Sequence, residues 1–292
     1  MNARIARSML LVVLAAVALV GWSTSLWAQG CPAQPLYSPD FTSNQSCTTL
    51  NGNATYPAPV GSAATIRSWS GSNGVVTFQA TNSFTAGEVI ILSGFANSTF
   101  FNNLAFPVLR TGLSSRQFEI SFTGFTGPSD TGTATPLRPL QLTPAKSKQA
   151  GSAWFNTQQP VSGGFSSTFT FQLRGATTYP ADGIAFVIQN STQVNGQGNP
   201  TALGPNGCGI GFGDSSTGCT TSTGGIPNSL AVELNTYLNS GIDKSANSVS
   251  IQSNGTNANC VDPSCTLPGG LNYQLPVTMT DGNIHTVQVS YS

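Results

Sequence analysis

The stretch SLAVELNTYLNSGID, Ser229 to Asp243, carries oxygen-bearing side chains at a spacing that suits a metal or ligand site. The residues concerned are Glu233, Asn235, Tyr237, Asn239 and Asp243. The first three occupy every second position, and such side chains lie on one face of a β-strand. Calcium prefers oxygen ligands from carboxylates, amides and backbone carbonyls, which this segment can supply. A polar strand face without a ligand is the alternative interpretation.

Short alternating segments separated by turn residues predict the strands around this stretch. FSSTFTFQL alternates Phe165, Phe169 and Phe171 with Ser and Thr, which is typical of a half-buried strand. The same pattern recurs in GIAFVIQN, SLAVELNTY, NSVSIQS and IHTVQVSY, and no window repeats apolar residues at helical spacing. The sequence therefore predicts an all-β sandwich with Greek-key or jelly-roll connections.

Residues 62–136 differ from their surroundings and predict a small separate β module. The segments GVVTFQA, GEVIILSG, AFPVLR and RQFEISF read as closely spaced strands, with hairpin-like breaks such as SGSNG. The flanking PAPVGS and TATPLRP are rich in Pro and small residues, as linkers and insertion points tend to be. Since its acidic residues are scattered and it contains neither His nor Cys, we expect a spacer or adhesive role.

Composition and the N-terminus indicate export. Charged residues make up 7% of the chain, and ten basic residues balance ten acidic ones, so no excess charge attracts nucleic acid or an anionic membrane. Arg4 and Arg7 precede the apolar run MLLVVLAAVALVGW, which predicts a signal peptide cleaved after Ala28. An uncleaved anchor is the alternative. We expect a secreted or cell-surface protein without membrane insertion after cleavage.

The six cysteines all follow this signal and predict disulfides: Cys31, Cys47, Cys208, Cys219, Cys260 and Cys265. Three sequence-local pairs, 31–47, 208–219 and 260–265, are the simplest of the many pairings that six cysteines allow. A zinc site is not expected, because His285 is the only histidine and CVDPSC has no second close Cys pair.

The chain resembles the legume-lectin-like (L-type) carbohydrate-binding family. The resemblance rests on six segments in the family's order: FTSNQSCTTLNGNA, LQLTPAKSKQAGSAWF, FSSTFTFQL, ADGIAFVIQ, SLAVELNTYLNSGID and DGNIHTVQVSY. It implies, after a signal peptide of residues 1–28, a concanavalin-like jelly-roll sandwich of residues 29–61 and 137–292, interrupted by the 62–136 module. The family's domain continues past its equivalent of HTVQVSY, so we expect a fragment that lacks the C-terminal strands.

The resemblance also implies a sugar site. In this family a metal-organised loop holds sugar hydroxyls against an aspartate, a backbone amide and an asparagine. Asp182 matches the aspartate, Asn239 matches the asparagine, and Tyr237 or Phe212 would stack on the sugar. The glycine-rich GCGIGFG, which includes Gly211, would bring backbone close to the ligand, as Gly permits.

Cation ligands are implied at Glu233, Asn235, Tyr237, Asn239 and Asp243. Asn235 stands where the family has an aspartate that bridges calcium and a transition metal, and Ser248 stands about where it has a metal-binding histidine. An amide and a hydroxyl serve a transition ion less well than a carboxylate and an imidazole. We therefore expect a weakened calcium site and no transition metal.

These residues favour a secreted, non-catalytic lectin that binds glycans or polysaccharide and could form a homo-oligomer. A structural or adhesive cell-surface protein with a degenerate sugar site is one alternative. A glycoside hydrolase is another, but it needs two carboxyl groups flanking the bond, and ELNTY offers only Glu233. His285 shares a strand face with Val287 and Val289, which predicts a packed or boundary histidine rather than a catalyst.

Overall fold

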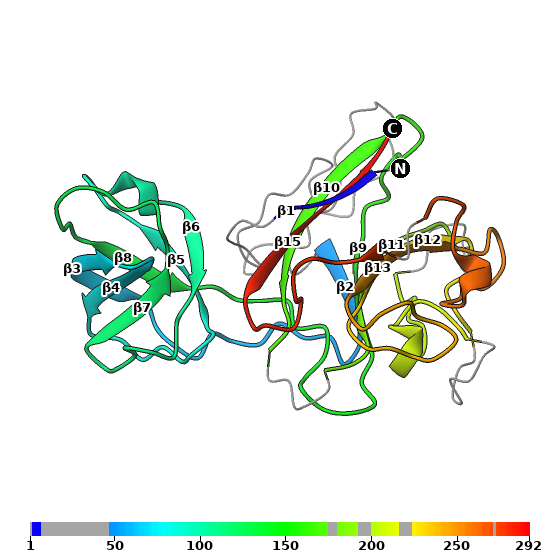
Figure 1. Cartoon of the computed structure of the whole chain (residues 1–292), viewed down its shortest axis with the longest axis horizontal. Coiled ribbons are helices and arrows are strands. Elements are labelled where there is room, and N and C mark those ends of the chain that lie inside the picture. Colours follow the sequence, from blue (N-terminus) through cyan, green and yellow to red (C-terminus); the bar gives the residue numbers. More distant parts are fainter. Residues whose placement is uncertain (1, 7–46, 175–179, 192–199, 216–223, 271–272) are drawn as a thin grey trace.

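The regular elements in the described part of the chain are β-strands and short 3-10 turns (Figure 1). The structure, a computed structural model, describes residues 2–6, 47–174, 180–191, 200–215, 224–270 and 273–292. The prediction of an all-β chain is therefore confirmed. Three separate bodies of sheet matter for the site: a six-stranded unit, a front sheet and a back sheet.

The six-stranded unit stands to one side of the other sheets in Figure 1. It is built from β3 (Ala64–Ser72), β4 (Val75–Ala80), β5 (Val89–Ser93), β6 (Leu104–Pro107), β7 (Gln117–Ser121) and β8 (Gly132–Pro136), with η2 (Thr99–Phe101) before β6. The strand order is β6-β5-β8-β3-β4-β7, with antiparallel neighbours. Asn73 and Gly74, at φ 51° and 76°, turn β3 into β4, which suits the Asn-Gly pair in SGSNG.

Aromatic side chains fill the interior of this unit. Phe78, Phe101 and Phe118 are fully buried, and the Phe78 and Phe118 rings stack at 5.0 Å between centroids. Trp69 is also buried, and its indole N–H donates to the Ser98 hydroxyl at 2.9 Å, so burial leaves no unpaired donor there. The buried members of this core all lie between residues 64 and 134, so the unit has a hydrophobic core of its own.

The back sheet consists of β10 (Phe165–Gln172), β15 (Ile284–Tyr291) and β1 (Asn2–Ala6), in the order β1-β15-β10. The β10 and β15 strands are antiparallel over their whole length, from Phe165 opposite Tyr291 to Gln172 opposite Ile284. Residues 2–6 belong to the predicted signal peptide, so cleavage after Ala28 would remove β1 from the edge of β15.

The front sheet has the order β11-β12-β13-β14 and packs on the back sheet. Its strands are β11 (Gly183–Gln189), β12 (Ser229–Asn235), β13 (Ser248–Ser253) and β14 (Tyr273–Gln274). Val232 and Leu234 of β12 point toward Phe169 and Val287 of the back sheet and form the sandwich core. Because side chains alternate, the other face of β12 carries Ala231, Glu233 and Asn235. That face is buried too, under the segment with η3 (Gly207–Gly209) and other loops.

A two-stranded sheet of β2 (Thr48–Gly52) and β9 (Gly151–Phe155) flanks the six-stranded unit in the chain, since β2 precedes β3 and β9 follows β8. Gly151 is required there, since a Cβ at this position would lie 1.9 Å from the Leu142 carbonyl oxygen. A small apolar contact joins the six-stranded unit to the back sheet, where Ile284 of β15 packs against Val89, Ala105 and Leu137.

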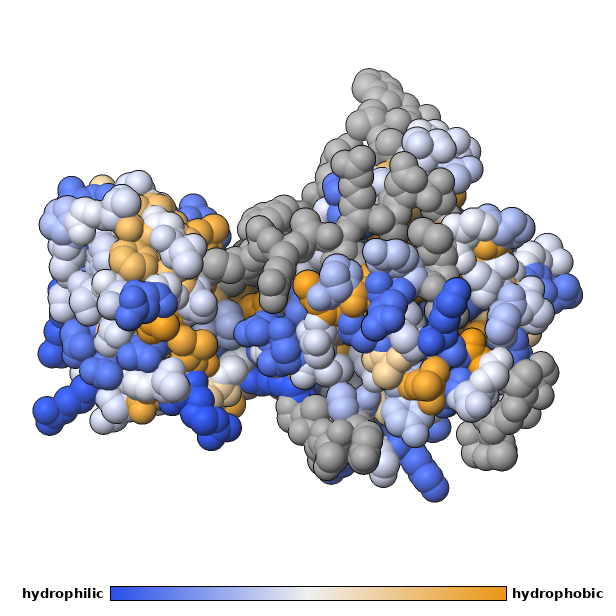
Figure 2. Space-filling model, viewed as in Figure 1, coloured by the Kyte–Doolittle hydropathy of each residue, from blue (hydrophilic) through white to orange (hydrophobic). Residues whose placement is uncertain are grey.

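One predicted disulfide is confirmed in full: Cys260 is bonded to Cys265, beside η4 (Pro263–Cys265). Cys47 and Cys208 are also disulfide-bonded, while Cys31 and Cys219 lie outside the described residues. No helix among the described residues is long and apolar enough to span a membrane. On the face shown in Figure 2, hydrophobic residues form small patches separated by hydrophilic ones.

Candidate functional site

Three adjacent strands bring the candidate residues to one end of the front sheet. In the antiparallel register Asn235 lies opposite Gly183 of β11 on one side and opposite Ser248 of β13 on the other. Asp182 immediately precedes β11, and the loop that carries Asn239 and Asp243 immediately follows β12. Residues from distant parts of the sequence therefore share one sheet end.

Asp182 and Asn239 are in direct contact, although 57 positions separate them in the sequence. The Asn239 side-chain amide donates to Asp182 Oδ1 at 3.4 Å, and the Asp182 backbone carbonyl accepts from the Thr236 N–H at 2.8 Å. The Ala181–Asp182 peptide bond is cis. Burial raises the pKa of Asp182, the Asn239 hydrogen bond lowers it, and the charge of Asp243 raises it, with a net rise. An acceptor and a donor thus lie side by side, as recognition of sugar hydroxyls requires.

Side-chain oxygens hold the loop after β12 in shape. Asn235 Oδ1 accepts from the Tyr237 N–H at 3.1 Å, and Asp243 Oδ2 accepts from the Asn239 N–H at 2.7 Å. The Asn239 carbonyl in turn accepts from the N–H groups of Ile242 and Asp243. Asn and Asp side chains that bind backbone two residues on replace a backbone turn, which is what Asn235 does here.

Glu233 is buried beneath this loop, with 2% of its surface exposed. Its Oε2 accepts from the Ser250 hydroxyl at 2.8 Å and from the Gln252 amide at 3.3 Å, while its Oε1 is buried without a hydrogen-bond partner. Burial raises the pKa of Glu233 to about 7; hydrogen bonds from Ser250 and Gln252 oppose the rise, and the charge of Asp243 adds to it. Burial therefore favours the protonated, neutral form of Glu233.

The donors around Glu233 do not fit a transition metal. Asn235 turns its oxygen toward the Tyr237 N–H and leaves its Nδ2 buried without a partner. Ser248, opposite Asn235, donates its hydroxyl hydrogen bond to the Ser245 carbonyl at 3.1 Å. Among the described residues no group of three or more His, Cys, Asp or Glu side chains is arranged to hold a metal ion. A transition ion would meet one carboxylate oxygen and no nitrogen ligand, a poor set for such an ion.

The loop after β12 fits a hard cation better, because its donors are oxygens. Asp243 supplies one carboxylate, and the Asn239 side chain keeps its amide oxygen while its nitrogen faces Asp182. Calcium accepts carboxylate, amide and backbone carbonyl oxygens in flexible geometry. The donor set is therefore compatible with calcium but poor in charge.

The glycine-rich segment approaches Asp182 at Gly207 rather than at Gly211. A Cβ built on Gly207 would lie 3.9 Å from Asp182 Oδ2, whereas one on Gly211 would meet Leu203 and the Gly151 carbonyl. Both glycines have positive φ, 68° and 75°, which a larger residue rarely adopts. Gly207 belongs to the GCGIGFG motif, but only the fold shows which glycine of that motif lies near the Asp182 carboxylate.

The two predicted stacking residues differ in exposure. The Phe212 ring is fully buried in the cluster on the outer face of β12, so it offers no face to a ligand. Tyr237 is 40% exposed, and its neighbour Leu238 is 50% exposed. Of the two rings, Tyr237 alone is open to a sugar.

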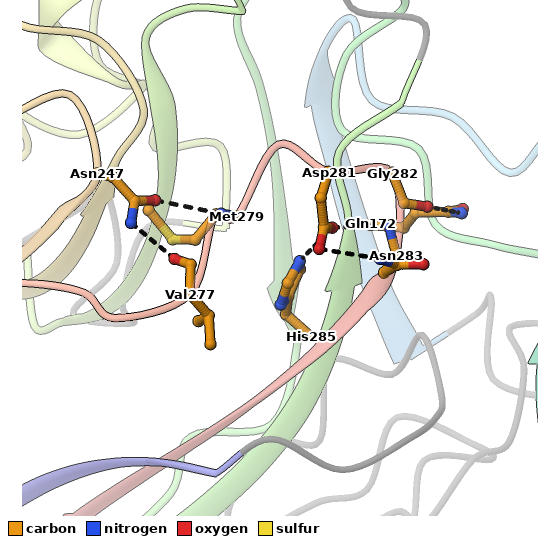
Figure 3. Close-up of polar contacts among 8 residues, drawn as sticks. All are labelled: Gln172, Asn247, Val277, Met279, Asp281, Gly282, Asn283 and His285. Carbon is orange, nitrogen blue, oxygen red and sulfur yellow. Dashed lines mark hydrogen bonds and ion pairs between the residues drawn. The ribbon is translucent and has the colours of Figure 1, made fainter. Parts of the chain in front are cut away.

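A segment between β14 and β15 ties the site loop to the back sheet (Figure 3). Asn247, one residue before β13, donates to the Val277 carbonyl at 2.6 Å and accepts from the Met279 N–H at 3.1 Å. At the other end of the segment His285 Nε2 contacts Asp281 Oδ1 at 2.8 Å, and the ring lies 5.5 Å from that of Phe171. The prediction of a boundary histidine is confirmed.

Sequence reasoning missed the residues that hold Glu233. Ser250 and Gln252 lie on β13 and reach Glu233 only because the register sets Glu233 opposite Ser250. The alternation of polar residues in NSVSIQS was the available signal, since it predicts one polar face on that strand. The strand partner could not be read from it.

Comparison with known families identifies one domain in this chain. The family model described as the legume lectin domain matches residues 93–292, which include Asp182, the loop after β12 and all of β15. The match begins inside the six-stranded unit and does not by itself separate that unit from the sandwich. Comparison with curated proteins found no match. The matched range covers more than half of the chain, and its fold is the all-β concanavalin-like sandwich, so this chain belongs to the legume lectin family.

Proposed function

We propose that the protein is a secreted, non-catalytic lectin that binds sugar hydroxyls at the end of the front sheet. The contact between Asp182 and Asn239 is the observation that carries the proposal. It brings the carboxylate and the amide expected of the family's sugar site together from two separate segments. Tyr237 supplies an exposed ring beside them, and Gly207 supplies backbone that a side chain does not cover.

Calcium is the cation that the loop would hold. Its ligands would be the Asp243 carboxylate, the Asn239 amide oxygen, the Tyr237 carbonyl and the single neutral oxygen of Asn235. When bound, calcium supplies positive charge that fixes the loop and so the Asn239 side chain. Because Asp243 is the single carboxylate among these ligands, we expect calcium to bind weakly. The hydrogen bonds within the loop therefore contribute to holding its conformation.

Catalysis is not part of the proposal. A glycoside hydrolase must place two carboxyl groups on either side of the scissile bond. Glu233 is 2% exposed and is held by Ser250 and Gln252, so a substrate does not reach it in this conformation.

Glycan-array binding, with and without a chelator, tests the proposal with an Asp182→Asn variant. We expect Asp182→Asn to bind the glycans that the wild type binds at least tenfold more weakly, because a charge-assisted hydrogen bond is replaced by a neutral one. The matched control is Asp214→Asn, whose carboxylate accepts from the Ser215 N–H and whose backbone pairs with that of Cys260. Absence of binding to any glycan, or equal loss in both variants, would refute the lectin proposal.

A structural or adhesive surface protein with a degenerate sugar site is the second candidate. The buried, unpartnered amide of Asn235 and the committed hydroxyl of Ser248 favour it. Calorimetry discriminates the two, because a ligand of the native state raises the melting temperature. A rise with calcium supports a functioning site, whereas no change with calcium and no glycan binding supports the degenerate one.

Residues 62–136 act, in this proposal, as an inserted spacer or adhesive module. Their own hydrophobic core and the small contact through Ile284 support that assignment. The sandwich would then comprise residues 29–61 and 137–292.

A further inference from the structure

A large open cleft lies between the six-stranded unit, the segments that connect it, and the sandwich. Its volume is about 2490 Å³, well above the roughly 300–1,000 Å³ of sites for small molecules. Its wall includes the β6–β7 loop, the β8–β9 connection, the end of β10, Asp182 and Gly207, together with apolar residues of the sandwich such as Phe169 and Phe186. A cleft of this size suits a polymer rather than a single sugar.

Basic side chains gather along this cleft. Of the ten Lys and Arg residues, Arg4 and Arg7 belong to the predicted signal peptide. Half of the remaining eight line the cleft, and all four are exposed: Arg110, Lys146, Lys148 and Arg174. They come from three separate segments of the chain. Arg174 reaches toward the six-stranded unit, since a Cβ on Gly87 would lie 3.4 Å from its Nη1.

These four side chains have no acidic partner among the described residues. The ion pair formed among the described residues joins His285 to Asp281 and involves none of the four. All acidic residues of the chain except Asp40 lie in the described part. The cleft's own acids are already engaged. Glu88 is 6% exposed and accepts from the Gly61 and Thr85 N–H groups, as Asp281 and Asp182 accept from their own neighbours. The four cations are exposed, whereas Glu88 is buried and all three carboxylates of the lining accept hydrogen bonds, so the lining carries a formal excess of one positive charge and its exposed ends are mainly cationic.

We propose that the cleft binds an extended anionic polysaccharide, through its carboxylate or sulfate groups. Arg and Lys recognise such groups by charge-assisted hydrogen bonds. The choice of a glycan rests on the proposed lectin function, because Asp182 and Gly207 are among the residues that line the cleft. In this proposal one sugar unit of the polymer occupies the site at Asp182. The rest of the polymer lies along the cleft, where the four cations contact its anionic groups.

The test uses the mature protein and immobilised polygalacturonate, with dextran as the neutral polymer. The cleft variant is Lys146→Gln/Lys148→Gln/Arg174→Gln. The control, Arg67→Gln/Arg116→Gln/Lys244→Gln, removes the same charge from exposed residues outside the cleft. We expect the wild type to prefer polygalacturonate over dextran, with about tenfold weaker binding in the cleft variant and little change in the control. The preference should shrink as salt screens it.

Equal weakening in both triple variants would overturn the proposal, because it would mean that net charge alone attracts the polymer. So would failure to bind polygalacturonate or dextran sulfate, or equally tight binding of single-stranded DNA. Asp182→Asn separates the two hypotheses. If Asp182→Asn loses binding of neutral glycans but keeps binding of polygalacturonate, both sites are supported. If Asp182→Asn loses binding of polygalacturonate and the cleft variant keeps it, the cleft is not a binding site.

Discussion

Replacing Glu233 by Gln should remove a pH dependence of stability that the fold builds in. The carboxyl is 2% exposed, and its pKa rises from 4.5 to about 7 because burial disfavours the charged form. An acid whose pKa is raised on folding binds its proton more tightly in the folded state. Its stabilisation is therefore full below pH 4.5, falls as pH rises through the window from 4.5 to 7, and is constant above it.

The size of the effect follows from that window. Each pKa unit corresponds to about 1.4 kcal/mol, so the wild type should lose on the order of 2–3 kcal/mol of unfolding free energy between pH 5 and pH 8 from this group. Glu233→Gln keeps an acceptor for Ser250 and Gln252 but does not ionise. The variant should therefore gain stability relative to the wild type as pH rises.

Urea unfolding at several pH values between 5 and 8, in EDTA, measures both proteins. The difference between their free energies cancels the other titrating groups. Glu119→Gln in the six-stranded unit is the control exchange and should parallel the wild type. If the wild type and Glu233→Gln show the same pH dependence, Glu233 is not a neutral buried acid, and the reasoning fails.

Three further predictions concern the fold. Phe78→Ala should cost about 3–5 kcal/mol and lower a calorimetric transition of the six-stranded unit; an equal shift of the sandwich transition would contradict a separate core. Gly151→Ala should lower the free energy of unfolding in urea by about 1–3 kcal/mol or more, because its Cβ would meet the Leu142 carbonyl. Gly163→Ala is the control and should have little effect, since no atom lies within 4 Å of its Cβ. Equal effects would contradict the close approach of Leu142 to Gly151. Asp281→Asn should cost about 1 kcal/mol at pH 7, because the pair with His285 lies at the surface but is only partly exposed. Burial acts to raise the pKa of Asp281, but hydrogen bonds from Asn283 and His285 outweigh it and lower the pKa. The contribution is thus present above pH 3.8 and lost below it, so a deficit that persists at pH 2 in urea titrations would refute this origin.

The strands were predictable from short runs of β-forming residues, which alternate with polar residues where one face of the strand is exposed. FSSTFTFQL, GIAFVIQN and IHTVQVSY correspond to β10, β11 and β15. Alternation marks the core face of β10 and β15, whereas β11 is apolar on both faces because both are covered. The SGSNG break was also predictable, since Asn73 and Gly74 adopt the positive φ that a two-residue hairpin needs. Local chemistry sufficed in both cases.

The parts that the sequence could not supply depend on contacts between distant segments. Phe212 looked available for stacking, but loops cover the outer face of β12 and the ring fills their core. Gly207 and Gly211 are equivalent in sequence, and only the packing of their loop sets Gly207 near Asp182. Ser250 became the partner of Glu233 through strand register, which a single strand does not encode.

The amide at Asn235 has a physical reason in this setting. An aspartate there would place a second buried carboxylate on the strand face of Glu233, and without a cation between them one would have to take up a proton. Asn235 avoids that repulsion and keeps the acceptor that the loop uses, because its Oδ1 binds the Tyr237 N–H. Ser248, opposite, is likewise committed to a backbone carbonyl rather than to an ion. Hydrogen bonds thus hold the strand end where the family resemblance implies a transition metal, while Asp182 and Asn239 retain the residue types that the proposed sugar site needs. In the proposed lectin the sugar contacts do not require the transition ion, because they come from Asp182 before β11 and Asn239 after β12. Asn235 and Ser248, at the position implied for that ion, are held by their own hydrogen bonds.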